Sequence, residues 1–469
     1  MSAAELPIWT AEERESFFAA IARHRRAAWQ VSAVAAVCIA ILAFVVATLT
    51  SPLFYAVIGL LLDVINLVVP MPDLLGRVMD TLNFVSDNFE SLHASDWLRI
   101  ALIAALPGLI AVLIVLLTLR RIVREAEASG VQELALRAPD PAVLAEQRVA
   151  NVVAEMAIAA NIKMPKVAII DAPAVNAAVY GPDDETVTVL VSTGLLEKLD
   201  RARMQAVAGH LIGLIANGDV VQGMRVAQTL SLFGFVARLS DGIVDPPAWS
   251  RLWQTLREAL KPGASSADSR LILELTNPFG NAQSSRPAGG NASNKLTWRE
   301  WIRMPLYGPI VISGFFGGLV SSFMLEPLLA LIWRRRKYLA DAIAVQLTRD
   351  PQALSNALGE LGNGSGFPAW CSHMLVAGHA GRGGLLSGSS VPMYPAHDKR
   401  LKALARMGAS VVLSPPPRMP LWVQLLIAIG GAVVVSLMSV AIYLLVMVSI
   451  ALSGLFTMLP TVILHAILR

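Results

Sequence analysis

The sequence contains little charge. Asp, Glu, Lys and Arg make up only 15% of its 469 residues, whereas hydrophobic residues make up 55%. A soluble domain with so few charges would be hard to keep in solution, so the composition predicts an integral membrane protein. The formal net charge is only +4, and the basic residues flank apolar stretches rather than alternating with aromatic ones. This pattern excludes a nucleic-acid surface and makes the basic residues topology signals in a lipid bilayer.

Cysteine is also scarce. Only Cys38 and Cys371 are present, and Cys38 falls inside the first apolar stretch. Two cysteines placed in this way exclude a disulfide framework.

Long apolar runs are present and are bordered by arginine clusters. We predict membrane spans at about 28–50, 98–119 and 307–333, and an apolar C-terminal segment at 421–459. The positive-inside rule keeps the bordering arginines in the cytoplasm; these are Arg23, Arg25, Arg26, Arg120, Arg121, Arg124, Arg334, Arg335 and Arg336.

The same rule places residues 51–97 outside, as a loop with an interfacial or re-entrant helix and an amphipathic one. The run 53–69 is bounded by Pro52 and Pro70, and the run 226–237 is short for a crossing. Whether these two runs cross the membrane stays open. The 421–459 segment fits one long or kinked span or a tight hairpin.

One stretch between the apolar runs organises the chain. Residues 205–219 read as an apolar helix that starts soon after Asp200 and stops at the Asn217-Gly-Asp219 turn. It carries His210. Residues four apart on a helix share a face, so a second His at position 214 could bind the same metal, but Leu214 stands there.

Further motifs lie on either side of this helix. Upstream come Pro165-Lys166-Val, Asn176-Ala-Ala-Val-Tyr-Gly181 and Thr186–Leu196, which we expect to form a small mixed sheet over about 166–191 after a helix at about 142–160. Downstream come Arg336-Lys337-Tyr338-Leu-Ala-Asp341 on a helix, a helix opened by Pro351, and a last helix near Asp398–Lys402.

These motifs, in this order, resemble the HtpX-like and CAAX-prenyl-protease-type zinc metallopeptidases over roughly residues 140–405. The resemblance implies a mainly α integral membrane protein with an α+β zincin-like peptidase domain and about four to six membrane segments. It divides the chain into an N-terminal membrane region at 1–124, the peptidase-type domain at 125–420 with an insertion at 239–305, and a C-terminal membrane segment at 421–469.

The zinc ligands and the catalytic Glu of that family are mostly absent from the matching positions of this sequence. The family has His-Glu-x-x-His, where the two His bind zinc and the Glu activates water, and a third ligand on a later helix. Here the sequence has His210, Leu211 and Leu214, with Lys337 at the third ligand position and Tyr394 where a family His stands. We therefore predict no zinc and no intact catalytic residue. A displaced metal site built from Cys371, His373, His379 and His397 matches no common zinc pattern.

Other family positions are retained. Asp341 matches the residue that orients the first zinc His, so we predict a hydrogen bond from His210 to Asp341 and a structural role for Asn217 and Asp219. The Lys337 ammonium is predicted near the metal position, paired with a carbonyl or carboxylate. In the family, the strand before the metal helix lies along the substrate cleft, and Thr186–Ser192 alternates as an edge strand would. The candidate peptide-cleft residues are Asn176, Thr186, Val187, Thr188, Val189, Leu190 and Tyr394.

The sequence thus predicts a pseudopeptidase of the bacterial inner membrane, with its peptidase-like domain mainly cytoplasmic. It would bind membrane or unfolded polypeptide segments, or a partner membrane protein, as a scaffold or regulator, and it could form a homo-oligomer. One alternative is an active membrane zinc endopeptidase that acts in protein quality control. Another is a transporter or channel subunit, although the few intramembrane charges make no convincing pathway.

Overall fold

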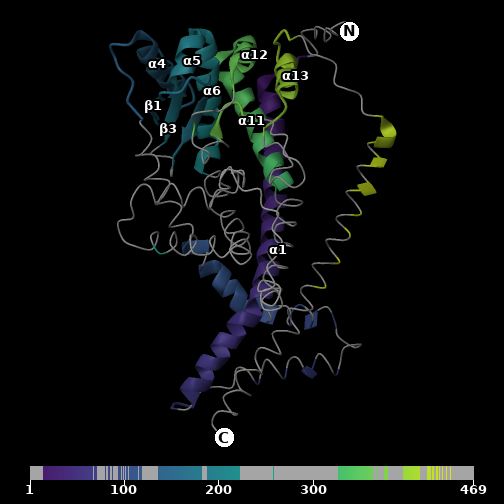
Figure 1. Cartoon of the computed structure of the whole chain (residues 1–469). Coiled ribbons are helices and arrows are strands. Elements are labelled where there is room, and N and C mark those ends of the chain that lie inside the picture. The colour runs from purple at the N-terminus through teal and green to yellow at the C-terminus, as the bar shows by residue number, and fades with distance from the viewer. Residues whose placement is uncertain are drawn as a thin grey trace, which may run out of the picture. The chain divides into compact units, whose positions relative to one another are not determined.

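A computed structural model describes residues 14–66, 136–181, 187–221, 326–362, 374–378 and 394–411, with scattered positions at 68–118, 257, 367 and 420–444. The described part is mainly helical with one small mixed sheet (Figure 1). Contacts divide the chain into two compact units. One comprises residues 1–35 and 119–416, and the other comprises residues 36–118 and 417–469.

The sheet lies in the first unit and has three strands in the order β1-β3-β2. They are β1 (Lys166–Ile170), β2 (Ala177–Tyr180) and β3 (Thr188–Ser192). Strand β3 pairs in parallel with β1 and antiparallel with β2. The predicted mixed sheet is therefore confirmed, with β3 in its centre.

One helix precedes the strands in the sequence, and two follow them. These are α4 (Leu144–Ala159) before β1, and α5 (Thr193–Lys198) and α6 (Arg201–Ala216) after β3. The start of α6 is set by Asp200, whose side chain accepts a hydrogen bond from Arg203 N. Its end is set by Asn217 and by Gly218, which has a positive φ of 66° that suits glycine. The helix predicted between Asp200 and the Asn-Gly-Asp turn is confirmed.

Three later helices complete the unit: α11 (Glu326–Thr348), α12 (Pro351–Glu360) and α13 (His397–Arg406). Asp350 caps α12, and Pro351 occupies its first turn, as predicted. Residue 333, the predicted end of a membrane span, lies inside α11. Helix α11 continues through the Arg334–Arg336 cluster, because a change from apolar to basic side chains does not interrupt backbone hydrogen bonding.

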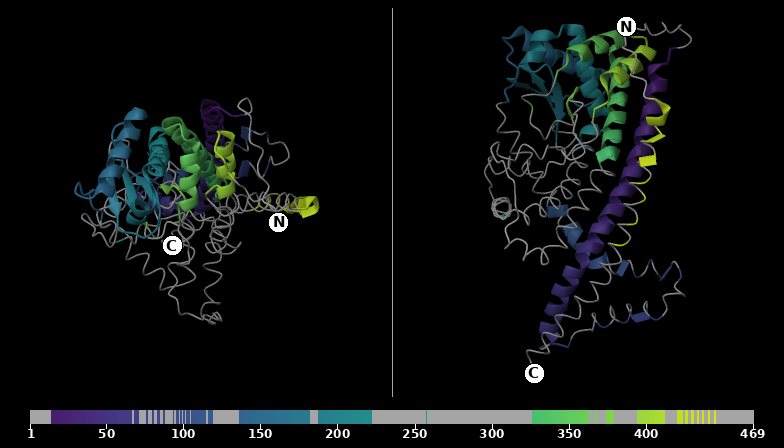
Figure 2. Two further views of the ribbon diagram at one scale, coloured as in Figure 1. Left: turned by 90° about the horizontal axis from the view of Figure 1, so that it is seen from above. Right: turned by 45° about the vertical axis from the view of Figure 1, so that its right-hand side comes forward.

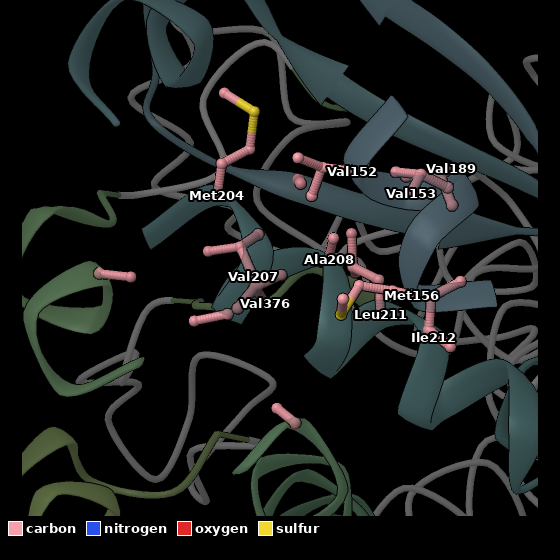
Figure 3. Close-up of a cluster of buried hydrophobic side chains, with 14 of the residues drawn as sticks. Val152, Val153, Met156, Val189, Met204, Val207, Ala208, Leu211, Ile212 and Val376 are labelled. Carbon is pink, nitrogen blue, oxygen red and sulfur yellow. The ribbon is translucent and has the colours of Figure 1, made fainter. Parts of the chain in front are cut away.

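Helix α6 is buried at Met204 and from Ala206 to Leu214, and it forms the centre of the main hydrophobic core. Its Val207, Ala208, Leu211 and Ile212 pack among side chains of α4 and β3 (Figure 3). Its other face lies directly against α11, where Gly209 approaches Ala344 and Gly213 approaches Ala340 and Ile343. Small residues on both helices allow this close approach. The further views show α6, α11 and α13 side by side (Figure 2).

Helix α1 runs from Phe17 to Asn66. Helix α1 is continuous through residue 50 and Pro52, so a helix expected within 51–97 follows the first apolar run without a break as far as Asn66. Proline removes one backbone donor, and helices tolerate it where neighbouring groups compensate. Beside it, Ser51 Oγ donates to Ala47 O at 2.9 Å and accepts from Gly108 N at 3.0 Å.

The first turns of α1 belong to the first unit. Ala20 and Ile21 form a small apolar cluster with Leu339, Ala342 and Ile343 of α11. His24 stacks on Tyr338, with ring centroids 5.4 Å apart.

Within the described residues, no helix combines the length and the hydropathy that a membrane crossing requires. The insertion at 239–305, the run 226–237 and most of the predicted segments 307–333 and 421–459 lie outside the described residues, as does the Gly-rich stretch at 379–388.

Candidate functional site

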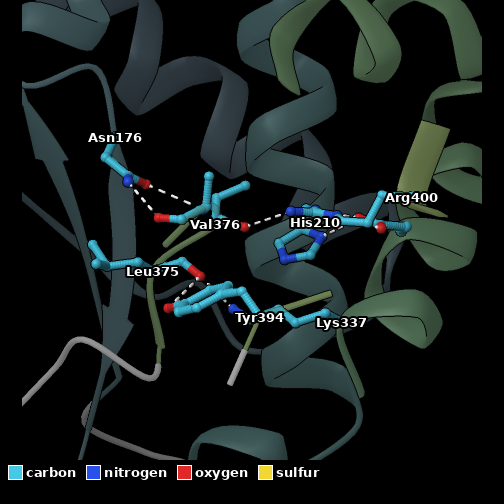
Figure 4. Close-up of polar contacts among 9 residues, drawn as sticks. Asn176, His210, Lys337, Leu375, Val376, Tyr394 and Arg400 are labelled. Atoms are coloured by element: carbon cyan, nitrogen blue, oxygen red, sulfur yellow. Dashed lines mark hydrogen bonds and ion pairs between the residues drawn. The ribbon is translucent and has the colours of Figure 1, made fainter. Parts of the chain in front are cut away.

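Helices α6 and α11 bring His210 and Asp341 together, although 131 positions separate them in the sequence. His210 is fully buried, and its Nδ1 lies 2.8 Å from Asp341 Oδ1 (Figure 4). The predicted hydrogen bond is confirmed. Burial lowers the pKa of His210 to about 4 despite the opposing effect of Asp341, so the imidazole is neutral at pH 7. Its Nδ1–H therefore donates to the carboxylate, and Nε2 carries the lone pair.

Arg400 of α13 completes the environment of Asp341. Its Nε donates to Asp341 Oδ2 at 2.8 Å, its Nη2 donates to Asp341 Oδ1 at 2.6 Å, and its Nη1 donates to Val376 O at 2.7 Å. Burial alone would raise the pKa of Asp341, but the Arg400 guanidinium, aided by His210, holds it well below its usual value. Asp341 is thus a permanent carboxylate shared by α6, α11 and α13.

Arg400 was absent from the predicted site residues. Its signal was present in the sequence, because Asp398–Lys402 matches the closing helix of the family and carries the arginine. Its bidentate pairing with Asp341 depends on two helices that are distant in sequence, and no spacing rule places them together.

Lys337 is the most unusual residue of the site. Its side chain is only 2% exposed, its Nζ donates to Leu375 O, and it lies 5.4 Å from the centre of the Tyr394 ring. This pairing with a carbonyl was predicted and is confirmed. Burial lowers the pKa of Lys337 to about 7, and Arg400 acts in the same direction.

The two leucines of the motif belong to the apolar core. Leu211 is 1% exposed and Leu214 is 2% exposed, and both are members of the main core cluster. Neither offers an atom that can bind a metal. Their packing contributes to stability in the way that any buried leucine does.

The site does not fit a zinc ion. Zinc needs three protein ligands in a catalytic site and four in a structural one. Of the three family positions, only His210 presents a donor, its Nε2, which has no hydrogen-bond partner among the described residues. Lys337 donates to Leu375 O instead of offering a lone pair.

The predicted ligands of a displaced metal site lie mostly outside the described residues. Among the described residues, no group of three or more His, Cys, Asp or Glu side chains could hold a metal. Of the proposed rescue ligands, Cys371, His373 and His379 lie outside the described residues, and His397 is exposed at the start of α13.

The Asn-x-Asp element following α6 has a structural environment. Asp219 is 2% exposed and accepts a hydrogen bond from Arg336 Nη1, while Asn217 N donates to Gly213 O as the C-cap of α6. Burial raises the pKa of Asp219 to about 6, against the effect of Arg336. Arg336 was not among the predicted site residues. It lies on α11, one residue before Lys337.

The prediction that Thr186–Ser192 is an edge strand is wrong. Strand β3 has a partner on each side, so Thr188, Val189 and Leu190 have no free edge for an added peptide. Val187 is buried, and Thr186 lies outside the described residues. Sequence alternation reports which face is buried, whereas the position of a strand in a sheet is set by its pairing with distant segments.

The other two cleft candidates contact the chain itself. Asn176 Nδ2 donates to Gly362 O at 3.0 Å and to Ala377 O at 2.6 Å. Tyr394 is 8% exposed, and its hydroxyl donates to Leu375 O at 3.4 Å. The described structure therefore brings Asn176 and Tyr394 together around residues 375–377 (Figure 4).

Comparison with known proteins finds a family match over the segment that holds α4, the sheet and α6. Residues 143–244 match the family model "Peptidase family M48". This segment belongs to peptidase family M48. Helix α6 and the strands preceding it lie within this M48-type segment.

Distant relatives are named as HtpX proteases. A "Protease HtpX homolog" of Ligilactobacillus salivarius is 29% identical over 208 residues, which are 44% of this chain and 55% of the relative. "Protease HtpX" of Xanthomonas oryzae pv. oryzae is 39% identical over 107 residues, which are 23% of this chain and 37% of the relative. The chain thus spans about half or less of the length of these relatives. No solved structure matches.

Proposed function

We propose that this protein is a membrane-bound pseudopeptidase of the M48 family that acts as a scaffold or regulator without hydrolysis. The observation that carries the proposal is the Lys337 hydrogen bond to Leu375 O at the third ligand position. The Lys337 ammonium that donates there offers no lone pair to a metal, and its charge repels a dication.

The state of the remaining positions supports the same proposal. Leu211 stands where the family has the carboxylate that activates water, and loss of such a general base costs about 10²–10⁴-fold in rate. Leu214 removes a second ligand. The His210–Asp341 pair remains, but Arg400 neutralises the carboxylate and ties it to α13. The pair therefore serves the packing of three helices.

Membrane attachment is part of the proposal and rests on the sequence. Apolar runs bordered by arginine clusters support spans near 28–50, 98–119, 307–333 and 421–459, with the M48-type domain mainly in the cytoplasm. The relatives occur in bacteria, which supports the inner membrane as the location. The bound partner is a membrane protein or a membrane or unfolded polypeptide segment.

The competing function is an active zinc endopeptidase, which the names of the relatives favour. Metal analysis and casein cleavage by the purified full-length protein separate the two. We expect less than about one zinc per ten chains and no cleavage above background. Stoichiometric zinc that disappears on His210→Ala would establish the endopeptidase instead.

A restored variant provides the positive control. Leu211→Glu, Leu214→His and Lys337→Glu together rebuild three ligands and the water-activating carboxylate on the existing helices. We expect this triple variant to bind zinc, and the same variant with His210→Ala to lose it. A triple variant that folds and binds no zinc would contradict the inference that the M48 frame is intact.

A further inference from the structure

The segment Met374–Gly378 runs along the free side of β2. Leu375 pairs with Ala178 in an antiparallel bridge, and Val376 N donates to Ala177 O at 2.9 Å. The other side of β2 is already paired with β3. An extended polypeptide that added a strand to this sheet edge would need the same backbone groups of β2.

Three side chains from three other parts of the fold hold the segment through successive carbonyls. Lys337 Nζ donates to Leu375 O, Arg400 Nη1 donates to Val376 O at 2.7 Å, and Asn176 Nδ2 donates to Ala377 O at 2.6 Å (Figure 4). Met374, Leu375 and Val376 are each at most 3% exposed.

The Tyr394 ring closes the end of the segment. A Cβ added at Gly378 would lie 2.0 Å from a Tyr394 ring carbon, so only glycine fits beneath the ring. The segment is therefore held by contacts along its whole length. One of its three side-chain donors, Lys337, stands at the position of the third zinc ligand in the family.

We propose that the segment Met374–Gly378 occupies the edge of β2 as a ligand from the same chain, and that Lys337 holds it there. When the segment leaves, the exposed edge of β2 can bind an extended aliphatic polypeptide. The aliphatic sequence Leu375-Val376-Ala377 shows the chemistry that the edge accepts. In the wild-type protein the edge is occupied, so a partner binds another surface. The inference rests on the proposed function, because Lys337 can hold the segment only if its position does not bind a metal.

Lys337→Met tests whether Lys337 holds the segment, because methionine keeps the apolar part of the side chain and removes the hydrogen-bond donor. Among the described residues, the Tyr394 hydroxyl at 3.4 Å is then the side-chain donor that remains for Leu375 O. We expect the Val376 amide to exchange with solvent roughly tenfold faster or more, since a buried hydrogen bond that pins the segment is lost.

The binding probe is a fluorescent peptide with the sequence of residues 372–379, used with the full-length protein in detergent. The matched control peptide has proline in place of Val376 and so lacks the N–H that bonds Ala177 O. We expect Lys337→Met to bind the natural peptide at least tenfold more tightly than the proline peptide, and the wild type to bind neither. Equal binding of both peptides, binding by the wild type as tight as by the variant, or no binding by the folded variant overturns the proposal.

Two further variants keep the test decisive if Lys337→Met does not fold. Val376→Pro in the protein removes the hydrogen bond to Ala177 O and leaves Lys337 in place, and this variant should also bind the natural peptide.

A disulfide tests where the peptide binds. Ala178→Cys with Leu375→Cys, in a background of Cys38→Ser and Cys371→Ser, joins residues that lie directly opposite each other. Added to an open variant, this disulfide should abolish peptide binding, and reduction should restore it. Binding that survives oxidation places the peptide elsewhere and refutes the proposal. Zinc content of the same samples bears only on the proposed function, so the two failures are distinguishable.

Discussion

His210 and Asp341 share a buried hydrogen bond of 2.8 Å, and Leu211 and Leu214 on the same helix offer no atom that binds a metal. In metal sites, a carboxylate of this kind fixes the tautomer and orientation of a ligating histidine. Here the same carboxylate accepts two hydrogen bonds from Arg400. The pair has become part of an ion-pair network that joins α6, α11 and α13.

The first prediction concerns this network. Asp341→Ala leaves the Arg400 guanidinium buried without its carboxylate, and breaking a buried pair from one side costs about 3–5 kcal/mol. We expect a loss of that size in the free energy of unfolding, measured by denaturant titration with circular dichroism. The matched control is Asp341→Leu with Arg400→Met, which removes both charges and should cost clearly less. Equal losses in the two variants would mean that the network contributes packing alone.

The second prediction concerns pH and His24. Burial, aided by Arg23 and Arg335, lowers the pKa of His24 from 6.5 to about 4. Between these values the unfolded chain binds a proton that the folded chain does not. Folding stability therefore falls as the pH decreases from about 6.5 to 4, by up to about 1.4 kcal/mol per pH unit for one proton.

His24→Phe keeps the aromatic stack on Tyr338 and removes the titrating group. The slope of unfolding free energy against pH should become shallower by up to one proton between pH 4 and 6.5. His210 remains in both proteins and contributes equally to both curves. Parallel curves for the wild type and the variant would show that His24 does not titrate in this window.

The elements that the sequence predicted well are those defined by local signals. Helix α6 starts at Asp200 and ends before Gly218, and both ends depend on residues within one turn of the helix. The His210–Asp341 bond was also predictable, since both residues lie in motifs that resemble those of the HtpX-like family. Local capping signals thus predicted where the helix begins and ends, and the motifs predicted one contact between α6 and α11.

The errors arise where distant segments decide the outcome. The central place of β3 follows from its pairing with both β1 and β2, which its own alternation does not encode. The occupation of the β2 edge depends on residues 375–376, about 200 positions further along the chain. Pro52 was taken as the boundary of the apolar run 53–69, and α1 continues through it because one missing backbone donor does not outweigh the turns on either side.

The third prediction concerns membrane topology, which rests on the arginine clusters. Single cysteines are introduced as Asp87→Cys and Lys402→Cys in a background of Cys38→Ser and Cys371→Ser. Both positions are exposed in the structure, so burial does not limit labelling. An impermeant maleimide added to intact cells should label position 87 and leave position 402 unlabelled until the membrane is permeabilised. The reverse pattern would overturn the assigned orientation.

The fourth prediction concerns the close contact between α6 and α11. A Cβ added at Gly213 would lie 3.2 Å from Ala340 O and 3.2 Å from Ile343 Cβ, so the helices meet there without room for a larger side chain. Gly213→Val forces the helices apart or strains the side chain, and overpacking of this kind costs about 1–3 kcal/mol. The control is Gly359→Ala on the exposed side of α12, where an added Cβ meets nothing within 4 Å. That change should leave stability unchanged or raise it by up to about 1 kcal/mol, because alanine favours the helix over glycine. Thermal unfolding followed by circular dichroism measures both variants. A Gly213→Val variant as stable as Gly359→Ala would show that the two helices do not approach as closely as described.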